Sequence, residues 1–404
     1  MRFFRDISGR PPFFRHQIRR IVTIAFIGAA LSACVGGSGL DPLPPQGSQT
    51  GGQSGDSSTI GTGQVKIGLL LPLTASGNGA AVGNSLRNAA ELAIVEFNEP
   101  NVQLLVKDDK GTAEGAAAAA REAFGQGAEL IIGPLFAPSV KAVADIARPA
   151  GKPIMAFSTD ATVAGRGAYL LSFLPESDVE RIISYAASRG KKSYSALIPQ
   201  TAYGNVVAAA FQESVARNGG RVVALERYTP GTGLAAAMRN VSQGANEIDA
   251  LFIPQNGEEL ASVAPLLASN KIDTKRIQLL GTGLWNDPRV FRMPQLVGGW
   301  FAAPDATGFT SFAARYKAKY GSDPARIATL SYDAVALAAA LVRTRGSERF
   351  SETTLTNASG FAGQDGVFRF RNDGLNDRGL AVQQIGNGTA SIISPTPKSF
   401  GTKS

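Results

Sequence analysis

Short apolar runs and one-sided helical patterns alternate along most of the chain. The first run, residues 65–71, reads VKIGLLL and has no polar alternation, which predicts a strand buried on both faces. The following segment places Leu86, Ala89, Ala93 and Phe97 on one side of a helix. Repeated strand–helix units of this kind predict parallel sheets that are covered by helices on both faces.

The same alternation continues to residue 394, which is long enough for two sheets. The expected fold is therefore α/β, with two doubly wound parallel-sheet lobes. The last two strands, 367–370 and 380–385, are expected to flank the Asn-Asp-Gly turn at 372–374. The other expected strands are 102–108, 130–132, 153–157, 193–198, 221–226, 250–253 and 277–280. The other expected helices are 113–126, 139–150, 177–189, 203–218, 235–242, 258–269, 309–320 and 326–342.

The N-terminus has a different pattern, typical of an export signal. A basic segment is followed by an uncharged apolar run at residues 21–31, which is too short to span a membrane as a helix. The run ends in Leu31-Ser32-Ala33-Cys34, which resembles the lipobox of bacterial lipoproteins. That resemblance implies a signal peptide at 1–33 and a lipid on Cys34, with an ordinary leader as the alternative. Several buried acyl chains would hold the protein on a membrane.

A Gly-, Ser- and Pro-rich stretch follows the cysteine up to residue 64. It has no apolar periodicity and only two charged residues, Asp41 and Asp56. Such a composition buries too little surface to offset chain entropy. Residues 34–64 are therefore expected to be the lipidated cysteine and a flexible tether.

Composition narrows the chemistry of the rest of the chain. The only histidine is His16 and the only cysteine is Cys34, so the body has neither. This excludes Ser-His-Asp and Cys-His catalysis, His-ligated zinc and disulfides there. Of the formal net charge of +8, the first 33 residues carry +5 (six Arg, one Asp), so the charge argues little for nucleic-acid binding. Binding is favoured over catalysis, with no cofactor and no metal expected.

Several motifs together resemble a type 1 periplasmic binding protein of the leucine/isoleucine/valine class. They are the opening strand and loop at 67–74, the acidic pair at 108–109, Ile-Ile-Gly-Pro at 131–134, Ala-Tyr-Gly at 202–204 and Tyr-Asp-Ala-Val at 332–335. The resemblance covers about residues 65–393. It implies two lobes, three hinge crossings and closure around a small molecule.

The crossings are expected near 172–176, 302–305 and 345–351. The first lobe would then comprise residues 65–174 and 304–350. The second lobe would comprise residues 175–303 and 351–394, followed by a tail at 395–404.

The resemblance also implies site residues in the first lobe. In amino-acid binders of the family, a hydroxyl after the third strand meets the ligand carboxylate; Ala137 holds that place and offers only its N–H. The next family loop matches at Ala161-Thr162, preceded by Ser158 and Thr159. The Thr162 hydroxyl is expected to donate to a carboxylate, and the Ala161 carbonyl to accept from an amine. The alternative is a polar loop stabilised by Ser/Thr turns.

In the second lobe, Tyr203 matches the aromatic residue that lies over the ligand, the alternative being a partly buried ring at a helix start. The family acid that holds the ligand ammonium aligns with Gly283, so Asp160 or Asp287 would have to compensate. Trp285 is expected either as a wall of the cleft or as simple packing. Asn256 is a further candidate for the cleft.

Two functions therefore stay open. The first is a lipid-anchored solute receptor of an ABC importer, which binds an amino acid or related small molecule between its lobes and docks on a permease. The second is an outer-membrane lipoprotein that regulates a peptidoglycan synthase. Both place the protein in the periplasm, anchored to the inner or outer membrane. Enzymatic activity is not expected, because the Gly-rich loop at 76–79 has no Walker A lysine.

Overall fold

The computed structural model describes residues 59–98 and 100–400. The predicted signal peptide (1–33), Cys34 and most of the predicted tether lie outside the described residues. Within the described part, no helix is long and apolar enough to cross a membrane.

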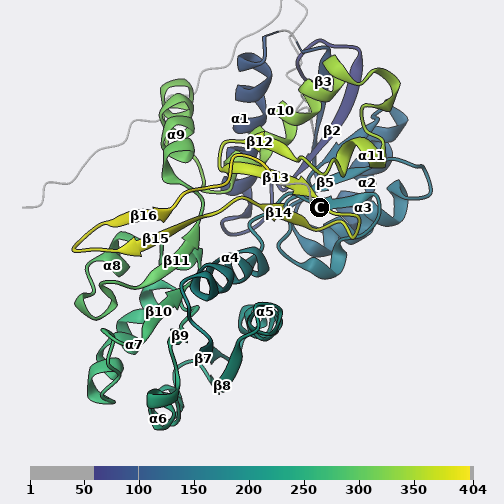
Figure 1. The fold of residues 1–404 in the computed structure, drawn as a ribbon. Coiled ribbons are helices and arrows are strands. Elements are labelled where there is room, and N and C mark those ends of the chain that lie inside the picture. The colour runs from purple at the N-terminus through teal and green to yellow at the C-terminus, as the bar shows by residue number, and fades with distance from the viewer. Residues whose placement is uncertain (1–58, 99, 401–404) are drawn as a thin grey trace, which may run out of the picture. The chain divides into compact units, whose positions relative to one another are not determined.

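The first lobe, of which strands β2, β3 and β5 are labelled in Figure 1, is built on a six-stranded sheet in the order β1-β3-β2-β4-β5-β6. Strands β2 to β6 are parallel, and only the short edge strand β1 runs antiparallel to its neighbour. The strands are β1 (Thr59–Ile60), β2 (Val65–Leu71), β3 (Val102–Asp108), β4 (Leu130–Ile132), β5 (Ile154–Ala156) and β6 (Ala168–Leu170).

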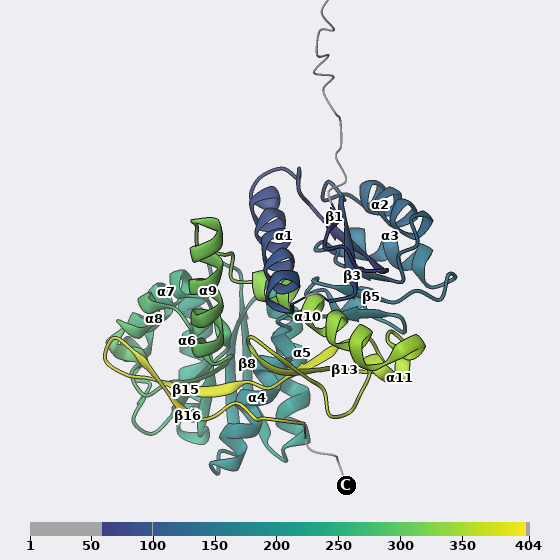
Figure 2. The same ribbon diagram turned by 90° about the horizontal axis from the view of Figure 1, so that it is seen from above.

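Helices cover both faces of this sheet (Figure 2). Leu69 and Leu71 of β2 pack under α1 (Gly79–Glu96) and α10 (Ala328–Thr344). Leu70, which points to the opposite face, packs under α2 (Ala113–Gly125) and α3 (Ala137–Ala147). The apolar run without alternation is explained by this burial, because successive side chains enter two different cores.

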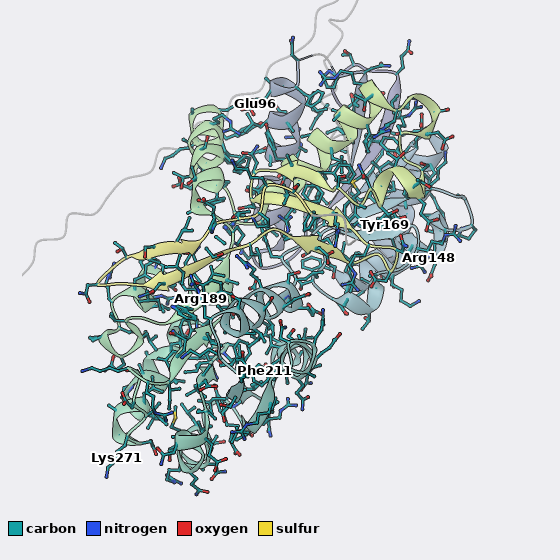
Figure 3. The ribbon with its side chains drawn as sticks, in the orientation of Figure 1. Glu96, Arg148, Tyr169, Arg189, Phe211 and Lys271 are labelled. Atoms are coloured by element: carbon teal, nitrogen blue, oxygen red, sulfur yellow. The ribbon has the colours of Figure 1, made fainter. Side chains whose placement is uncertain are left out.

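The second lobe has a seven-stranded sheet in the order β16-β15-β11-β10-β9-β7-β8. Its two faces carry separate cores, one under α4 (Pro175–Ser188) and α5 (Ala202–Arg217), the other under α6 (Leu234–Gln243) and α7 (Gly257–Ser269). Figure 3 labels Tyr169 and Phe211, one buried ring from each lobe. The strands are β7 (Ser193–Pro199), β8 (Arg221–Tyr228), β9 (Ala250–Phe252), β10 (Gln278–Gly281), β11 (Trp300–Ala303), β15 (Ala381–Ile385) and β16 (Ala390–Ser394), and the short α8 spans Pro288–Phe291. The predicted fold class is confirmed.

The remaining elements complete the first lobe. Helix α9 (Ala306–Tyr320) packs its Phe312 and Tyr316 against α1. After α10 come α11 (Glu352–Leu355) and a small antiparallel sheet of β12 (Phe361–Gly363), β13 (Gly366–Phe370) and β14 (Asn376–Arg378).

The chain passes between the lobes three times: after β6, after β11 and between β14 and β15. The predicted third crossing at 345–351 is wrong, and residues 351–378 belong to the first lobe. The reason is packing: Phe350, Leu355, Phe368 and Phe370 are all buried in the core under α1 and α10. The third crossing is at residues 379–380.

The predicted late hairpin is also wrong in one strand. Across the turn at 372–374, β13 pairs with β14, whereas β15 pairs with β11 and β16 in the other sheet. The short strands β1, β6, β11, β12, β14 and β16 were not predicted. The tether prediction is wrong at its end, because Thr59 and Ile60 pair with β3 and Ile60 is buried in the first-lobe core.

Candidate functional site

The predicted site residues all follow the carboxyl ends of parallel strands. In the first lobe, Ala137 comes after β4 and residues 158–162 come after β5. In the second lobe, Tyr203, Asn256 and Trp285 come after β7, β9 and β10. Because the carboxyl ends of neighbouring parallel strands share one edge of a sheet, the topology gathers these residues at one edge of each lobe.

In the first lobe, the helix start after β4 presents an apolar ring. Ala137 is the first residue of α3, so its N–H has no partner inside the helix. Phe136, just before it, is 37% exposed and lies against Gly111, where an added Cβ would come within 3.1 Å of the ring. This edge therefore offers a backbone donor next to an apolar surface.

The loop after β5 uses its polar groups on itself. The buried Ser158 Oγ accepts a hydrogen bond from the Asp160 N–H at 3.1 Å. The Asp160 carboxylate accepts from both the N–H and the hydroxyl of Thr162, at 2.9 and 2.7 Å. These bonds cap a short 3₁₀ turn at Ala161–Val163. This arrangement matches the second of the two predicted possibilities, a polar loop stabilised by its own Ser/Thr turns. Thr159 and Thr162 stay exposed, so a ligand would compete with Asp160 for the Thr162 proton.

In the second lobe, Tyr203 is fixed by the way α5 begins. Thr201 Oγ1 accepts from the Gly204 N–H at 3.0 Å and caps the helix. An added Cβ at Gly204 would lie 1.8 Å from the Pro199 carbonyl, so only glycine permits this start. The Tyr203 hydroxyl is consequently held 2.9 Å from the hydroxyl of buried Thr282. Burial raises the pKa of Tyr203 well above its usual value, so the phenol stays neutral.

An acid reaches the same edge from a helix that the sequence pattern did not connect to it. Asp178, in the first turn of α4, accepts a hydrogen bond from the Gly283 N–H at 2.9 Å. Burial, reinforced by the nearby Glu176 carboxylate, raises the pKa of Asp178 to about 7. Neither acid forms an ion pair with any residue that the structure describes, and Glu176 Oε2 is buried without a hydrogen-bond partner there. The second-lobe edge is therefore acidic and suited to a cation.

Gly283 makes this arrangement possible. An added Cβ at this position would lie 3.0 Å from Asp178 Oδ2, closer than two such atoms normally approach. The position that the family resemblance aligns with an acid thus receives a carboxylate from α4 instead.

A family model described as "Periplasmic binding protein" matches residues 64–390. This chain belongs to that family. The resemblance seen in the sequence is confirmed. No curated protein matches the sequence.

Solved structures of periplasmic binding proteins share the fold. A putative branched-chain amino acid ABC transporter protein from Rhodospirillum rubrum is 22% identical, with a TM-score of 0.70 over 81% of this chain and 99% of that one. A substrate-binding protein from Desulfitobacterium hafniense in complex with Leu is 19% identical, with a TM-score of 0.57 over 81% and 99%. A solute-binding protein from R. palustris in complex with benzoate is 19% identical, with a TM-score of 0.54 over 84% and 100%.

Three other candidates have structural partners. Trp285 is fully buried, its indole N–H donates to the Ile253 carbonyl at 2.9 Å, and its ring lies on Gly281 and Gly299. It is therefore a packing residue and does not form a wall of the cleft. Asn256 caps α7 by accepting from the N–H groups of residues 258 and 259. Asp287 caps α8 and pairs with Arg289, so it does not supply the missing acid.

The residues that sequence reasoning missed are Asp178, Glu176 and Thr282. The predicted helix at 177–189 is α4, which begins two residues earlier, at Pro175. Asp178 lies in the first turn of this helix, and its carboxylate reaches Gly283 in the loop after β10. The one signal in the sequence was Gly283 itself: a glycine at a position where the family has an acid suggests that another residue supplies the carboxylate. No group of three or more potential metal ligands occurs in the described part of the chain.

Proposed function

We propose that this periplasmic binding protein is a lipid-anchored solute receptor of an ABC importer that closes its lobes around an amino acid or a related small molecule bearing an ammonium group. One observation carries the choice of ligand: the Asp178 carboxylate lies beside the Tyr203–Thr282 pair without a basic partner among the described residues. A ligand ammonium would supply that partner, and closure would shield the pair from water.

The other groups fit the remaining parts of such a ligand. The Ala137 N–H can donate to a carboxylate, the Thr162 hydroxyl could do so only by giving up its bond to Asp160, and the exposed Phe136 offers apolar contact. The related structures with Leu and with benzoate represent two ligand classes that share a carboxylate but differ in the ammonium. The acidic edge favours the first class.

The test is a binding screen with the purified protein, using free amino acids, their amides and benzoate-type acids. Binding raises the unfolding temperature by mass action, and calorimetry then gives the affinity. We expect amino acids to bind and Asp178→Asn to weaken them at least tenfold, since a charge-assisted bond to the ammonium is lost. Asp145→Asn, an exposed acid on α3, is the control. Benzoate binding that is unchanged in Asp178→Asn, together with no response to amino acids, would contradict the ligand class.

Anchoring rests on Cys34 and needs its own experiment. Cells that express the protein are labelled with radioactive fatty acid and fractionated. We expect label on the native chain in the membrane fraction and a soluble, unlabelled Cys34→Ala variant, because the acyl chains supply the membrane affinity. An unlabelled native chain would leave the ordinary leader as the explanation.

The regulator of a peptidoglycan synthase stays the second candidate. The observation in its favour is the first-lobe loop, where the Thr162 proton is already used by Asp160 and no side-chain donor replaces Ala137. The two functions separate cleanly in a deletion strain: altered peptidoglycan polymerisation supports the regulator, and failed uptake of one solute supports the receptor.

A further inference from the structure

A cavity of about 500 Å³ lies in the first lobe, at the opposite edge of its sheet from the proposed ligand residues. Residues 151–153 and Gly167, which line it, come just before β5 and β6, at the amino ends of these strands. The rest of the wall includes the segment 350–352, where α11 begins. The volume is that of a typical small-molecule site, and none of the proposed interlobe residues lines it.

The charged side chains of this cavity are mostly basic and within reach of a ligand. Three basic side chains and one acidic side chain line it, which gives the wall a formal charge of +2. Arg166 pairs with Glu352 at 2.7 Å, so these two charges balance. Arg148 and Lys152 form no ion pair and no side-chain hydrogen bond with any residue of the described chain. Arg148 is exposed and Lys152 is partly exposed, so both charges are accessible from the cavity.

The floor of the cavity is apolar and fixed by the core. The Tyr169 side chain is 1% exposed, and its ring packs against that of Phe370 with centres 5.3 Å apart. Phe350 and Pro153, which are also buried, line the same cavity. Figure 3 labels Tyr169 and Arg148, which lie close together in the first lobe. Because these rings are already ordered, an apolar ligand group gains contact with them at little entropic cost.

Glycines leave the entrance of the cavity unobstructed. An added Cβ at Gly151 or at Gly167 would meet no atom within 4 Å, so a side chain there would project into open space. An added Cβ at Gly165 would come within 3.1 Å of the Arg148 guanidinium, so the glycine gives this group its room. The described structure therefore leaves access to both the charged side chains and the apolar floor.

We propose that this cavity is a second binding site, for an organic anion with a flat apolar body, such as an aromatic carboxylate. The apolar body lies on the Tyr169 and Phe350 side chains, and Arg148 and Lys152 bind the carboxylate. A guanidinium fork matches two carboxylate oxygens and also stacks on aromatic faces, which favours an aromatic body over an aliphatic one. A small inorganic anion would satisfy the charges but leave the apolar floor uncovered.

The site belongs to one lobe alone. All of its lining residues come from the first lobe, whereas the proposed interlobe site needs groups from both. Binding in the cavity therefore does not require closure of the lobes, and the inference does not rest on the proposed function.

The experiment titrates the purified native chain with sodium 2-naphthoate by calorimetry, with ionic strength held constant by sodium chloride. We expect saturable binding at one site per chain. 2-Naphthamide has the same rings without the charge and should bind at least about tenfold more weakly, since charge-assisted bonds are lost. Succinate has the charge without the rings and should also bind more weakly than naphthoate.

Two variants remove the unpaired charges one at a time. Arg148→Gln and Lys152→Gln change positions outside the apolar core, so neither requires the core to repack. We expect each to weaken naphthoate binding at least about fivefold. Lys141→Gln is the matched control, because Lys141 is an exposed lysine of α3 that pairs with Asp145 and does not line the cavity. It should bind naphthoate like the native chain.

The proposal is overturned by any of three results: no naphthoate binding at millimolar concentration, equal affinity for naphthoate and naphthamide, or equal naphthoate affinity in the native chain and both cavity variants. Asp178→Asn separates this site from the proposed ligand site and should leave naphthoate affinity unchanged. A loss in that variant would place naphthoate between the lobes and contradict the proposal. Failure of the amino-acid screen leaves this test unaffected.

Discussion

A single glycine decides how the proposed ligand edge of the second lobe obtains its acid. Gly283 leaves room for the Asp178 carboxylate and donates its N–H to it. Asp178 then has a raised pKa, which marks an acid that is partly removed from water and lacks a cationic partner. The surroundings of such an acid stabilise its charged form poorly, and a bound cation would stabilise it.

Buried acids also predict how stability depends on pH. Burial raises the pKa of Asp109 to about 6, and those of Asp178 and Asp333 to about 7, from 3.8. The folded state therefore binds more protons than the unfolded state between these values. The stability that these groups contribute is fully present below about pH 4 and is lost as the pH rises through 6 to 7.

Asp109→Asn tests this at one fully buried position. The amide oxygen can still accept from the Gly111 N–H, and the charge is gone. We expect the variant to gain up to about 3 kcal/mol relative to the native chain between pH 4.5 and 8, as one pKa unit corresponds to about 1.4 kcal/mol. Urea unfolding across this pH range measures it. The exposed Asp145→Asn should show no such trend.

Trp285→Phe distinguishes packing from a ligand contact. The indole N–H bond to the Ile253 carbonyl is lost and a gap opens above Gly281, so we expect a loss of about 3 kcal/mol of stability. Affinity for the ligand should not change. Trp300→Phe, at a partly buried edge ring, is the control and should cost less. A large loss of ligand affinity with little loss of stability would instead show that Trp285 contacts the ligand.

At the scale of elements, the long strands and helices were predictable because each buries one or two faces. The run at Val65–Leu71 is continuously apolar because both of its faces are buried, and the helix at Gly79–Glu96 has its apolar residues at helical spacing. The strand at Asn376–Arg378 shows none, because its Asn and Arg are buried by hydrogen bonds to the Ser172 carbonyl rather than by apolar contact. That is why the late hairpin was assigned the wrong partner.

The edge of the site was predictable for the same topological reason, but the chemistry at that edge was not. Residues after strand ends are placed by the sheet, so Tyr203 follows β7 and the 158–162 loop follows β5. Contacts such as Asp178 to Gly283 join residues 105 positions apart. No local pattern specifies such a pair, because it depends on how α4 packs on the second sheet.

The Asn256→Ala variant tests whether Asn256 acts as the N-cap of α7 or as a ligand-binding residue. Asn256 and Glu259 form a capping box at the start of α7. Loss of the cap should lower stability by about 1 kcal/mol and leave ligand affinity unchanged. Thr112→Ala, which removes the side-chain cap of α2, is the matched control and should give a similar loss. A drop in affinity for Asn256→Ala alone would place the amide in the ligand site.

At the scale of the whole molecule, the crossings are tied to one another. Asn376 and Arg378, which precede the third crossing, both donate to the carbonyl of Ser172 in the first, at 3.0 and 2.9 Å. The next residue, Phe173, has Arg326 and Arg378 at 4.7 and 4.6 Å from its ring centre. Two segments far apart in sequence therefore share one set of contacts, which makes the hinge a cooperative unit.

Phe173→Leu measures how much this arrangement contributes. Leucine keeps most of the apolar contact but removes the ring that faces two guanidinium groups, each worth about 0.5–1 kcal/mol or more when partly desolvated. We therefore expect a loss of about 1–2 kcal/mol in urea unfolding. Phe97→Leu is the control, since one arginine, Arg343, lies 4.9 Å from the Phe97 ring centre in the described structure. Its loss should be about half as large, because one cation is involved instead of two. Equal losses in the two variants would mean that the Phe173 ring acts through apolar packing and that the arginines at the hinge are held by their backbone acceptors.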